Sequence, residues 1–292
     1  MFIQLFKNNT IFDYSNFNFS KKIILESQTL QYKSSRISYY RFGDGERPVI
    51  CFHGYGETAE SFSFLAKYAG SQYSFFAIDL PFHGKTEWKE GLNFSMEDLN
   101  AISLSVAGHT DLPLTIMGFS LGGRMALSLY DDIPQKIDKL ILLAPDGLKV
   151  NFWYWLSTQT RLGNRFFAYT MKHPGWFFGL LQLMNKLKLV NASIFKFVKH
   201  YIGDINVRQL LYQRWTTLRK IKPHLSSIKS NITQYKTKIR LVYGIHDRII
   251  LSSVGEKFRS GIEDHCEINI IHSGHQVLHE KHVQEILPAL KD

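Results

Sequence analysis

A serine between closely spaced glycines is the residue of this sequence best suited to covalent chemistry. Ser120 stands where an apolar run passes into an amphipathic one, in Gly118-Phe119-Ser120-Leu121-Gly122. This spacing is typical of a sharp strand-to-helix turn that holds a serine hydroxyl exposed in strained backbone. A side chain at either glycine would clash in so tight a turn. The pattern therefore predicts Ser120 as a nucleophile, with Gly123 allowing the helix to pack closely on the sheet.

A serine hydroxyl is a weak nucleophile at neutral pH, so it needs a base within hydrogen-bond reach. Among twelve histidines, His275 directly follows the last apolar run and is the predicted base. His272 is expected on the strand itself, and His279 and His282 on a following helix, facing solvent. An alternative interpretation groups these four histidines as metal ligands. Their spacing lacks the helical pair plus third ligand of a zinc enzyme, so no metal is expected.

Two carboxylates compete to orient that base. Asp247 follows the penultimate apolar run, and Asp146 follows the run before a long insertion. Asp247 is preferred, because the chain order Ser, Asp, His with the acid on the penultimate loop is the commoner arrangement. Asp146 stays open as the alternative acid, and its other expected role is to cap the turn into the insertion.

An oxyanion that develops during the reaction needs two backbone N–H donors. The first predicted donor is the amide of Leu121, directly after the nucleophile. The second is the amide of Tyr55, where Gly54 and Gly56 let the backbone turn inward. His53 is expected to brace this loop rather than to act as a second base.

The elements that must position these residues alternate along the chain. An antiparallel strand pair is expected in 21–42, and further strands are expected at 48–52, 73–80, 114–119, 139–144, 239–243 and 267–271. Helices are expected at 58–68, at 121–132, at 253–260 and from Gln276 onward. One more helix is expected from a capping box at Ser95 to Gly108. This alternation predicts an α/β fold with an eight-stranded, mostly parallel sheet and helices on both faces. In such sheets the ligand site lies beyond the carboxyl ends of the strands.

The alternation breaks at residues 148–231, which we predict to be a separate helical module, with 1–147 and 232–292 forming the core. The whole chain of 292 residues has a net charge of +10. Residues 149–229 hold fourteen Lys or Arg against one acid, Asp204, and four of the five tryptophans. Such a shift in composition marks a distinct module.

The cysteines and the apolar runs bear on the compartment. Cys51 and Cys266 lie in apolar runs and are expected as buried free thiols, which suits a reducing compartment. The first twenty residues lack the pattern of a secretory signal, and no run reaches the about 18–20 apolar residues of a membrane span. A cytoplasmic location is therefore expected, with peripheral contact with a membrane as the second possibility.

Together these motifs resemble the successive signatures of the α/β-hydrolase superfamily over residues 30–290. The matching segments are His53-Gly54-Tyr55-Gly56, Asp79-Leu80-Pro81-Phe82-His83-Gly84, Gly118-Phe119-Ser120-Leu121-Gly122-Gly123, Gly244-Ile245-His246-Asp247 and Gly274-His275. The resemblance implies that the insertion is a cap or lid, and that no metal or organic cofactor is needed. Phe82 departs from the pattern, because many members have glycine there, and it adds bulk near the entrance, which makes it a candidate for contact with substrate.

The resemblance implies a serine hydrolase that cleaves a carboxylic ester or thioester through an acyl-enzyme. Ser120 argues against dehalogenases and epoxide hydrolases, which use a carboxylate nucleophile. Proline iminopeptidases bind a free amine with cap acids, which a module holding only Asp204 does not favour. The alternative is a C–C bond hydrolase or a lyase like the menaquinone-pathway carboxylate synthase, which share this triad. In the lyase Arg124 would reach a substrate carboxylate, and its other expected role is that of a surface residue or one that supports the site without touching substrate.

The basic, aromatic insertion favours an anionic or acyl-bearing substrate or surface. Trp153 and Trp176 are candidates for an acyl pocket, together with neighbouring phenylalanines. The same composition also suits contact with an anionic membrane. The alternative is that the aromatic residues form the core of the insertion and the lysines a solvated face. No nucleic-acid partner is expected, because an intact serine, histidine, acid and glycine set has no role in a binding module.

Overall fold

The computed structural model describes residues 26–69, 71–108, 112–150, 152–187 and 202–291. The chain divides into two compact units. We call the first, Ser27–Val150 with Thr217–Asp292, the α/β unit, and we call Asn151–Thr216 the helical unit. Each is described by itself.

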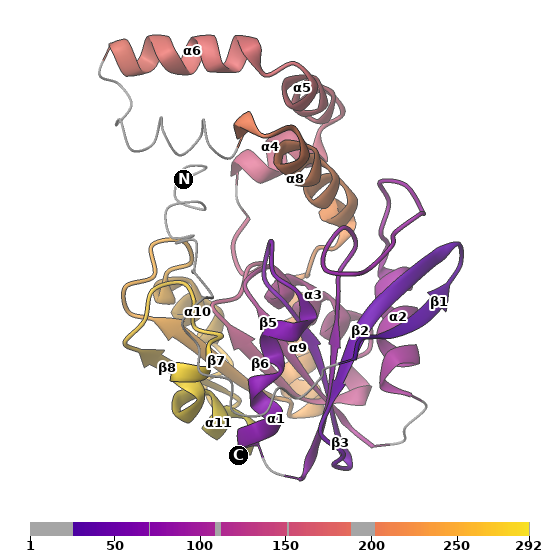
Figure 1. Cartoon of the computed structure of the whole chain (residues 1–292). Coiled ribbons are helices and arrows are strands. Elements are labelled where there is room, and N and C mark those ends of the chain that lie inside the picture. Colours follow the sequence, from indigo (N-terminus) through magenta and orange to yellow (C-terminus); the bar gives the residue numbers. More distant parts are fainter. Residues whose placement is uncertain (1–25, 70, 109–111, 151, 188–201, 292) are drawn as a thin grey trace. The chain divides into compact units, whose positions relative to one another are not determined.

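The α/β unit is built on one eight-stranded sheet in the order β1-β2-β4-β3-β5-β6-β7-β8 (Figure 1). Strands β1 and β2 pair antiparallel, as do β2 and β4, and every other pairing is parallel. The bounds are β1 Gln28–Tyr32, β2 Ser35–Phe42, β3 Arg47–Phe52, β4 Tyr73–Ile78, β5 Leu114–Phe119, β6 Ile137–Leu143, β7 Lys238–Gly244 and β8 Cys266–Ile271. The predicted eight-stranded, mostly parallel sheet is confirmed.

The central strands are apolar along almost their whole length because helices cover both faces of the sheet. Every residue of β5 is buried. One core cluster joins α2 (Met96–Ala107), α3 (Leu121–Asp132), α9 (Leu225–Tyr235) and α10 (Ser252–Arg259) to the sheet. Helices α1 (Phe64–Tyr68) and α11 (Val283–Lys291) contact each other. This packing leaves the carboxyl ends of β3, β5, β7 and β8 at one edge of the sheet.

Local sequence signals explain where several elements begin and end. Ser95 accepts a hydrogen bond from the Asp98 amide, and the Asp98 carboxylate accepts one from the Ser95 amide, which confirms the predicted capping box at the start of α2. Two helix predictions were too long. The segment 58–68 is a 3₁₀ turn (Ala59–Phe62) followed by the short α1, and the last helix begins at Val283, after a loop and a 3₁₀ turn.

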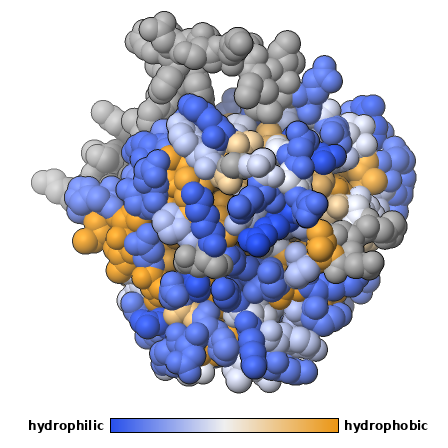
Figure 2. Space-filling model, turned by 90° about the horizontal axis from the view of Figure 1, so that it is seen from below, coloured by the Kyte–Doolittle hydropathy of each residue, from blue (hydrophilic) through white to orange (hydrophobic). Residues whose placement is uncertain are grey.

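Seen from below, the surface is largely hydrophilic, with the largest group of hydrophobic side chains at the left of the view and smaller groups at the right (Figure 2). Both cysteines are buried free thiols, as predicted. Among the described residues, no helix combines the length and the apolar character that crossing a membrane requires.

The helical unit contains α4 (Phe152–Gln159), α5 (Arg161–Lys172), α6 (Gly175–Lys186) and most of α8 (Ile205–Thr217). Its interior includes Phe167, Leu211 and Trp215. The Asn164 amide donates to the Ser157 carbonyl at 3.2 Å and to the Thr216 hydroxyl at 3.1 Å, which ties α5 to α4 and α8.

The helical unit ends earlier than the predicted insertion of 148–231. Leu218 and Ile221 are buried in the core cluster of the α/β unit, as are Ile228 and Ile232 of α9. Residues from Thr217 onward therefore belong to the α/β unit. The basic composition of the segment continues past this boundary, and for that reason composition alone placed the boundary too late.

Candidate active site

Ser120 sits in a strained turn between β5 and α3. Its backbone has φ 49° and ψ −113°, a combination that costs energy in a residue with a side chain. The turn is held by the Ser120 amide, which donates to the Leu143 carbonyl at 2.9 Å. The Ser120 carbonyl in turn accepts from the amides of Gly123 at 2.9 Å and Asp146 at 2.8 Å. These bonds fix Ser120 relative to the end of β6.

The neighbouring glycines are required by space, as predicted. A Cβ on Gly118 would lie 2.4 Å from the Gly122 carbonyl oxygen, and one on Gly122 would lie 1.9 Å from the Phe52 carbonyl oxygen. A Cβ on Gly123 would lie 2.4 Å from Cβ of Pro145. The helix therefore approaches the sheet more closely than any side chain at these positions would allow.

The structure brings Ser120, His275 and Asp247 together in one hydrogen-bonded chain. The His275 Nε2 lies 2.9 Å from the Ser120 hydroxyl, and the His275 Nδ1 lies 2.7 Å from Oδ2 of Asp247. A carboxylate accepts only, so Nδ1 carries a proton and donates it. Nε2 of the neutral ring then has a lone pair that accepts from Ser120. This is the tautomer that a general base needs.

Asp247 is held by its own loop. Its side chain is fully buried, and Oδ1 accepts from the amides of Ile249 at 2.7 Å and Ile250 at 3.0 Å. The loops after β7 and β8 are pressed together, since a Cβ on Gly244 would lie 2.0 Å from the Gly274 carbonyl oxygen. Backbone amides of its own loop thus hold the Asp247 side chain in line behind the imidazole.

Asp146, the alternative acid, is engaged elsewhere. Its Oδ2 lies 3.1 Å from the Arg124 guanidinium, and its Oδ1 accepts from the Gly147 amide at 2.8 Å. Arg124 is itself largely buried. The structure therefore places Asp247, and not Asp146, at His275, and Asp146 caps its turn as expected.

The predicted oxyanion donors follow two neighbouring strands of the sheet. Tyr55 follows β3, and Leu121 is the first residue of α3, directly after β5 and Ser120. Strands β3 and β5 are neighbours, with Phe52 opposite Gly118 in the register. Gly54 packs against the Phe119 ring so closely that a Cβ would lie 2.9 Å from it.

His53 braces the loop that carries Tyr55. Its Nε2 accepts from the Leu80 amide at 3.1 Å, so Nδ1 is the protonated nitrogen and donates to the Gly54 carbonyl at 2.8 Å. The ring is completely buried and lies 5.0 Å from that of His83. This geometry ties the loop after β3 to the loop after β4.

The loop after β4 is organised by Asp79. Its carboxylate accepts from the amides of Ala59 at 2.7 Å and Lys85 at 3.0 Å. Gly84 has φ 51°, and a Cβ there would overlap that carboxylate. Phe82 also has a positive φ of 62°, and its half-buried ring packs on the core. Its predicted contact with substrate stays a prediction.

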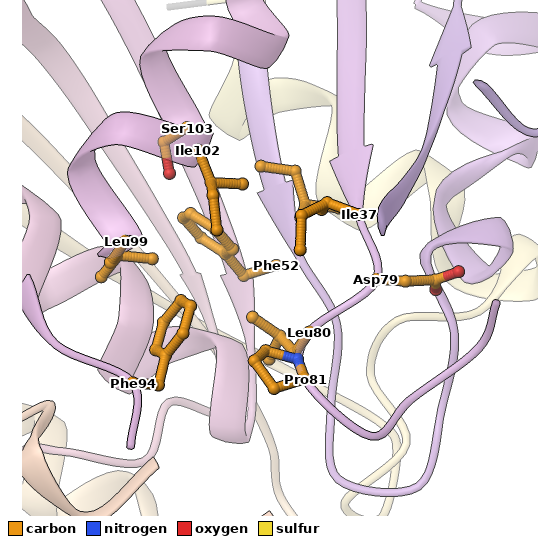
Figure 3. A pocket seen from close by; sticks show the side chains of 10 residues that line it. Ile37, Phe52, Asp79, Leu80, Pro81, Phe94, Leu99, Ile102 and Ser103 are labelled. Atoms are coloured by element: carbon orange, nitrogen blue, oxygen red, sulfur yellow. The ribbon is translucent and has the colours of Figure 1, made fainter. Parts of the chain in front are cut away.

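A small apolar pocket lies beside these loops, between β2, β3, β4 and α2 (Figure 3). Phe52, Leu80 and Phe94 turn toward it, whereas the Asp79 carboxylate points away. Its lining does not include the three residues that converge at Ser120. Trp153 and Trp176 belong to α4 and α6 of the helical unit, so their assignment to substrate binding also stays a prediction.

Two residues that the sequence reasoning did not single out join the site. The Gln276 amide donates to Oε1 of Glu57 at 2.7 Å, and the Ser61 hydroxyl donates to Oε2 at 3.4 Å. Burial raises the pKa of Glu57 above its ordinary value, against the opposing effects of Gln276 and His275. The available signal was adjacency in sequence, because Gln276 directly follows His275, and Glu57 lies two residues after Tyr55.

The other histidines near the carboxyl end of the chain do not gather around a common point. His272 faces His246, with their Nε2 atoms 3.2 Å apart, and His279 accepts from the Lys281 amide at 3.1 Å. His282 is buried, contrary to the prediction that it faces solvent, because α11 packs inward directly after it. Within the described ranges, no three His, Cys, Asp or Glu side chains could hold a metal ion together.

The sheet and the turn at Ser120 define an α/β hydrolase. The chain belongs to the Hydrolase_4 family, described as serine aminopeptidase S33, whose model matches residues 44–282. It is 21% identical over 257 residues to an uncharacterized hydrolase, YugF, of Bacillus subtilis, which covers 81% of this chain and 86% of that protein.

Other similarities are partial or structural. The chain is 33% identical over 101 residues to a pimeloyl-[acyl-carrier protein] methyl ester esterase of Neisseria meningitidis. That match covers 35% of this chain and 38% of the esterase, so it spans well under half of either protein. The thioesterase domain from the curacin biosynthetic pathway superposes with a TM-score of 0.60 at 18% identity, over 91% of this chain and 99% of that domain. This likeness shows a shared fold.

Proposed function

We propose that this protein is a serine hydrolase that cleaves a carboxylic ester or thioester through an acyl-enzyme. The observation that carries the proposal is the hydrogen-bonded chain from Ser120 through His275 to Asp247, at 2.9 and 2.7 Å. A serine hydroxyl with a base at one hydrogen-bond length, and a buried acid behind that base, is the arrangement that nucleophilic acyl transfer needs.

In the first half of the reaction, His275 Nε2 takes the Ser120 proton as the oxygen attacks the acyl carbonyl. The imidazolium that forms is stabilised by the buried Asp247 carboxylate at Nδ1. The amides of Leu121 and Tyr55 donate to the oxyanion, and the amino terminus of α3 adds a favourable dipole. His275 then gives its proton to the leaving group, on the oxygen of an alcohol or the sulfur of a thiol. Ser120 is left acylated.

In the second half, water enters where the leaving group was. His275 takes a proton from this water as it attacks the acyl carbon, and the same amides stabilise the second tetrahedral intermediate. When this intermediate breaks down, His275 returns the proton to the Ser120 oxygen and the carboxylic acid is released. The described residues perform each step without an additional reactant besides water.

An ester or thioester fits this chain better than a peptide amino terminus does. Recognition of a free amino group needs a carboxylate side chain that contacts it. Asp204 is the single Asp or Glu in residues 152–187 and 202–216. Its carboxylate accepts from the amides of Asn206 at 2.7 Å and Val207 at 3.0 Å, so it is used as the cap of α8. The partial match to a methyl ester esterase also supports an ester substrate.

The alternative, a C–C bond hydrolase or a carboxylate synthase, would use Arg124 to hold a substrate carboxylate. Arg124 is largely buried and paired with Asp146 at 3.1 Å, so this role would require a competing anion to displace Asp146. We therefore place the ester or thioester first. We also propose that the helical unit acts as a cap, because the chain enters it beyond the carboxyl end of β6, the strand next to β5.

The test uses the full chain with p-nitrophenyl esters of increasing length, matching thioesters and a fluorophosphonate probe. Wild-type protein should be labelled at Ser120 and should show a burst of nitrophenol equal to the enzyme concentration where deacylation is slow. Ser120→Ala should lose labelling and turnover, whereas Ser128→Ala, on the same helix, should keep both. Retained turnover in Ser120→Ala would contradict the proposal.

A further inference from the structure

Helix α5 carries apolar side chains on the side that the helical unit does not bury. Phe167 and Met171 face the interior of the unit. Leu162, Phe166 and Tyr169 are exposed, and their spacing of four and three residues places them in one stripe along the helix. Folding of this helix therefore uses one apolar face and leaves a second one uncovered.

Helix α6 repeats this arrangement. Leu181 is buried. Trp176, Leu180 and Leu183, followed by Leu187 just after the helix, are exposed at steps of four, three and four residues. A helix that is apolar on both sides normally lies in a core or in a lipid environment. Exposure rises along the stripe to 53% at Leu183 and 59% at Leu187, so the second side is open.

The two stripes meet. The rings of Phe166 on α5 and Trp176 on α6 lie 5.1 Å apart between centroids. The turn between the two successive helices is short (Figure 1). We call the joined surface the apolar face; it consists of Leu162, Phe166, Tyr169, Trp176, Leu180, Leu183 and Leu187.

The charged side chains of α5 and α6 themselves have a single sign. Arg161, Arg165, Lys172 and Lys186 are exposed on the same two helices. Residues 152–187 contain no Asp or Glu. On α5 the three cations run beside the apolar stripe, where their long aliphatic stems can lie along an apolar surface while their charged ends reach outward. This combination is typical of helices that lie in the interface of an anionic bilayer.

We propose that the apolar face docks the protein onto the surface of an anionic lipid bilayer. Helices α5 and α6 have twelve residues each, about 18 Å, which is too short to cross a membrane but suited to lying in its interface. A second copy of the chain is a poorer occupant, because a symmetric contact would bring the cations of both copies together. An acidic protein would satisfy the cations but would not by itself account for seven exposed apolar side chains.

The test is flotation of the full chain with two sets of vesicles. One set is phosphatidylcholine alone, and in the other phosphatidylglycerol replaces about a third of it, enough to give a negative surface potential. Binding to the anionic vesicles should be at least about tenfold tighter and should weaken steadily as salt shortens the screening length. Equal partitioning into both sets at all salt concentrations would overturn the proposal.

Substitutions separate the apolar and the charged contributions. Leu180→Ser with Leu183→Ser should reduce vesicle binding at least about tenfold by removing buried methylene groups. The matched control is Leu251→Ser with Ile270→Ser in the α/β unit, since these residues are exposed to 53% and 47% and the test pair to 47% and 53%. Arg161→Gln with Arg165→Gln should remove most of the preference for anionic vesicles, whereas Lys136→Gln with Lys238→Gln should preserve it.

Three other outcomes would each replace the bilayer with another occupant. Unchanged vesicle binding with lost turnover of a soluble ester in the leucine variant would make the apolar face part of a substrate entrance. A dimer of the wild type in gel filtration without lipid, lost in the leucine variant, would make it a contact between copies. Binding to polyglutamate as tight as to anionic vesicles, and insensitive to the leucine substitutions, would indicate an acidic protein. Flotation needs no turnover, so its result stands apart from the proposed esterase activity.

Discussion

Gln276 donates a hydrogen bond of 2.7 Å to Glu57, and this contact joins the loops that follow β8 and β3. Gln276 directly follows His275 in the loop after β8, and Glu57 lies two residues beyond Tyr55 in the loop after β3. The proposed base and one proposed oxyanion donor are therefore linked through side chains as well as through the sheet. Acyl transfer depends on the distance between these two groups, so the link should affect rate more than binding.

Gln276→Ala is expected to lower kcat for a soluble ester about tenfold and to leave KM nearly unchanged. A side-chain hydrogen bond contributes roughly 0.5–1.5 kcal/mol, and about 1.4 kcal/mol corresponds to a tenfold change in rate. Gln31→Ala is a suitable control, because that amide donates to the Lys33 carbonyl on an exposed strand end. An unchanged kcat in Gln276→Ala would mean that the link has no part in positioning.

Glu57 should also affect how stability depends on pH. Burial raises its pKa above the ordinary value of 4.5, so the folded protein binds this proton more tightly than the unfolded chain does. The corresponding stabilisation is complete below pH 4.5 and is lost as pH rises through the raised pKa. The free energy of unfolding of Glu57→Gln, measured relative to wild type by urea denaturation, should therefore increase from pH 4 toward neutral pH. A difference that is constant with pH would contradict the raised pKa.

The two candidate acids should differ sharply when each is replaced by its amide. Asp247→Asn should lower kcat by about 10⁴-fold, because an amide can donate to Nδ1 and so favour the wrong imidazole tautomer. Asp146→Asn should lower kcat by a small factor, since Asp146 pairs with Arg124 and caps its own turn. Steady-state kinetics with one p-nitrophenyl ester measures both. Comparable losses in the two variants would argue that Asp146 also serves the base.

The residues that converge at Ser120 could be predicted because their signals are local. Gly118, Gly122 and Gly123 are required by backbone contacts within a single strand-turn-helix, and such contacts leave a readable spacing. Asp247 and His275 each follow an apolar strand directly, and the carboxyl ends of parallel strands share one edge. For these positions, the hydrophobic pattern of a strand and the turn residues that follow it are sufficient for the prediction.

What the sequence reasoning missed depends on tertiary contacts. Glu57 and Gln276 are separated by 219 positions, so no local pattern connects them. Helix α9 is amphipathic, like the helices of the insertion, and only its packing on the core cluster assigns it to the α/β unit. The segment after His275 has an apolar pattern that suits a helix, yet its first residues form a loop beside His275, and α11 begins only at Val283. In this segment, tertiary packing outweighed the helix propensity of the local sequence.

The two cysteine thiols should not react with thiol reagents in the native protein. Cys51 and Cys266 are both fully buried, and burial raises the pKa of Cys266 to about 12. A thiolate is the reactive form, so neither residue should react with Ellman's reagent at pH 8 until the protein is unfolded. Two equivalents should then react in guanidinium chloride. Rapid reaction of one equivalent under native conditions would contradict the burial of that thiol.

Gly122→Ala should be among the most damaging small substitutions in the α/β unit. The added Cβ would lie 1.9 Å from the Phe52 carbonyl oxygen, so α3 would have to move away from β3. We expect a loss of about 3 kcal/mol, which for a protein of this size lowers Tm by roughly 6–12 °C. Gly179→Ala is the control, because a Cβ there has no neighbour within 4 Å and alanine favours a helix interior. Its Tm should equal or slightly exceed that of wild type. Equal Tm values for the two variants would mean that the close approach of α3 to the sheet does not require glycine at position 122.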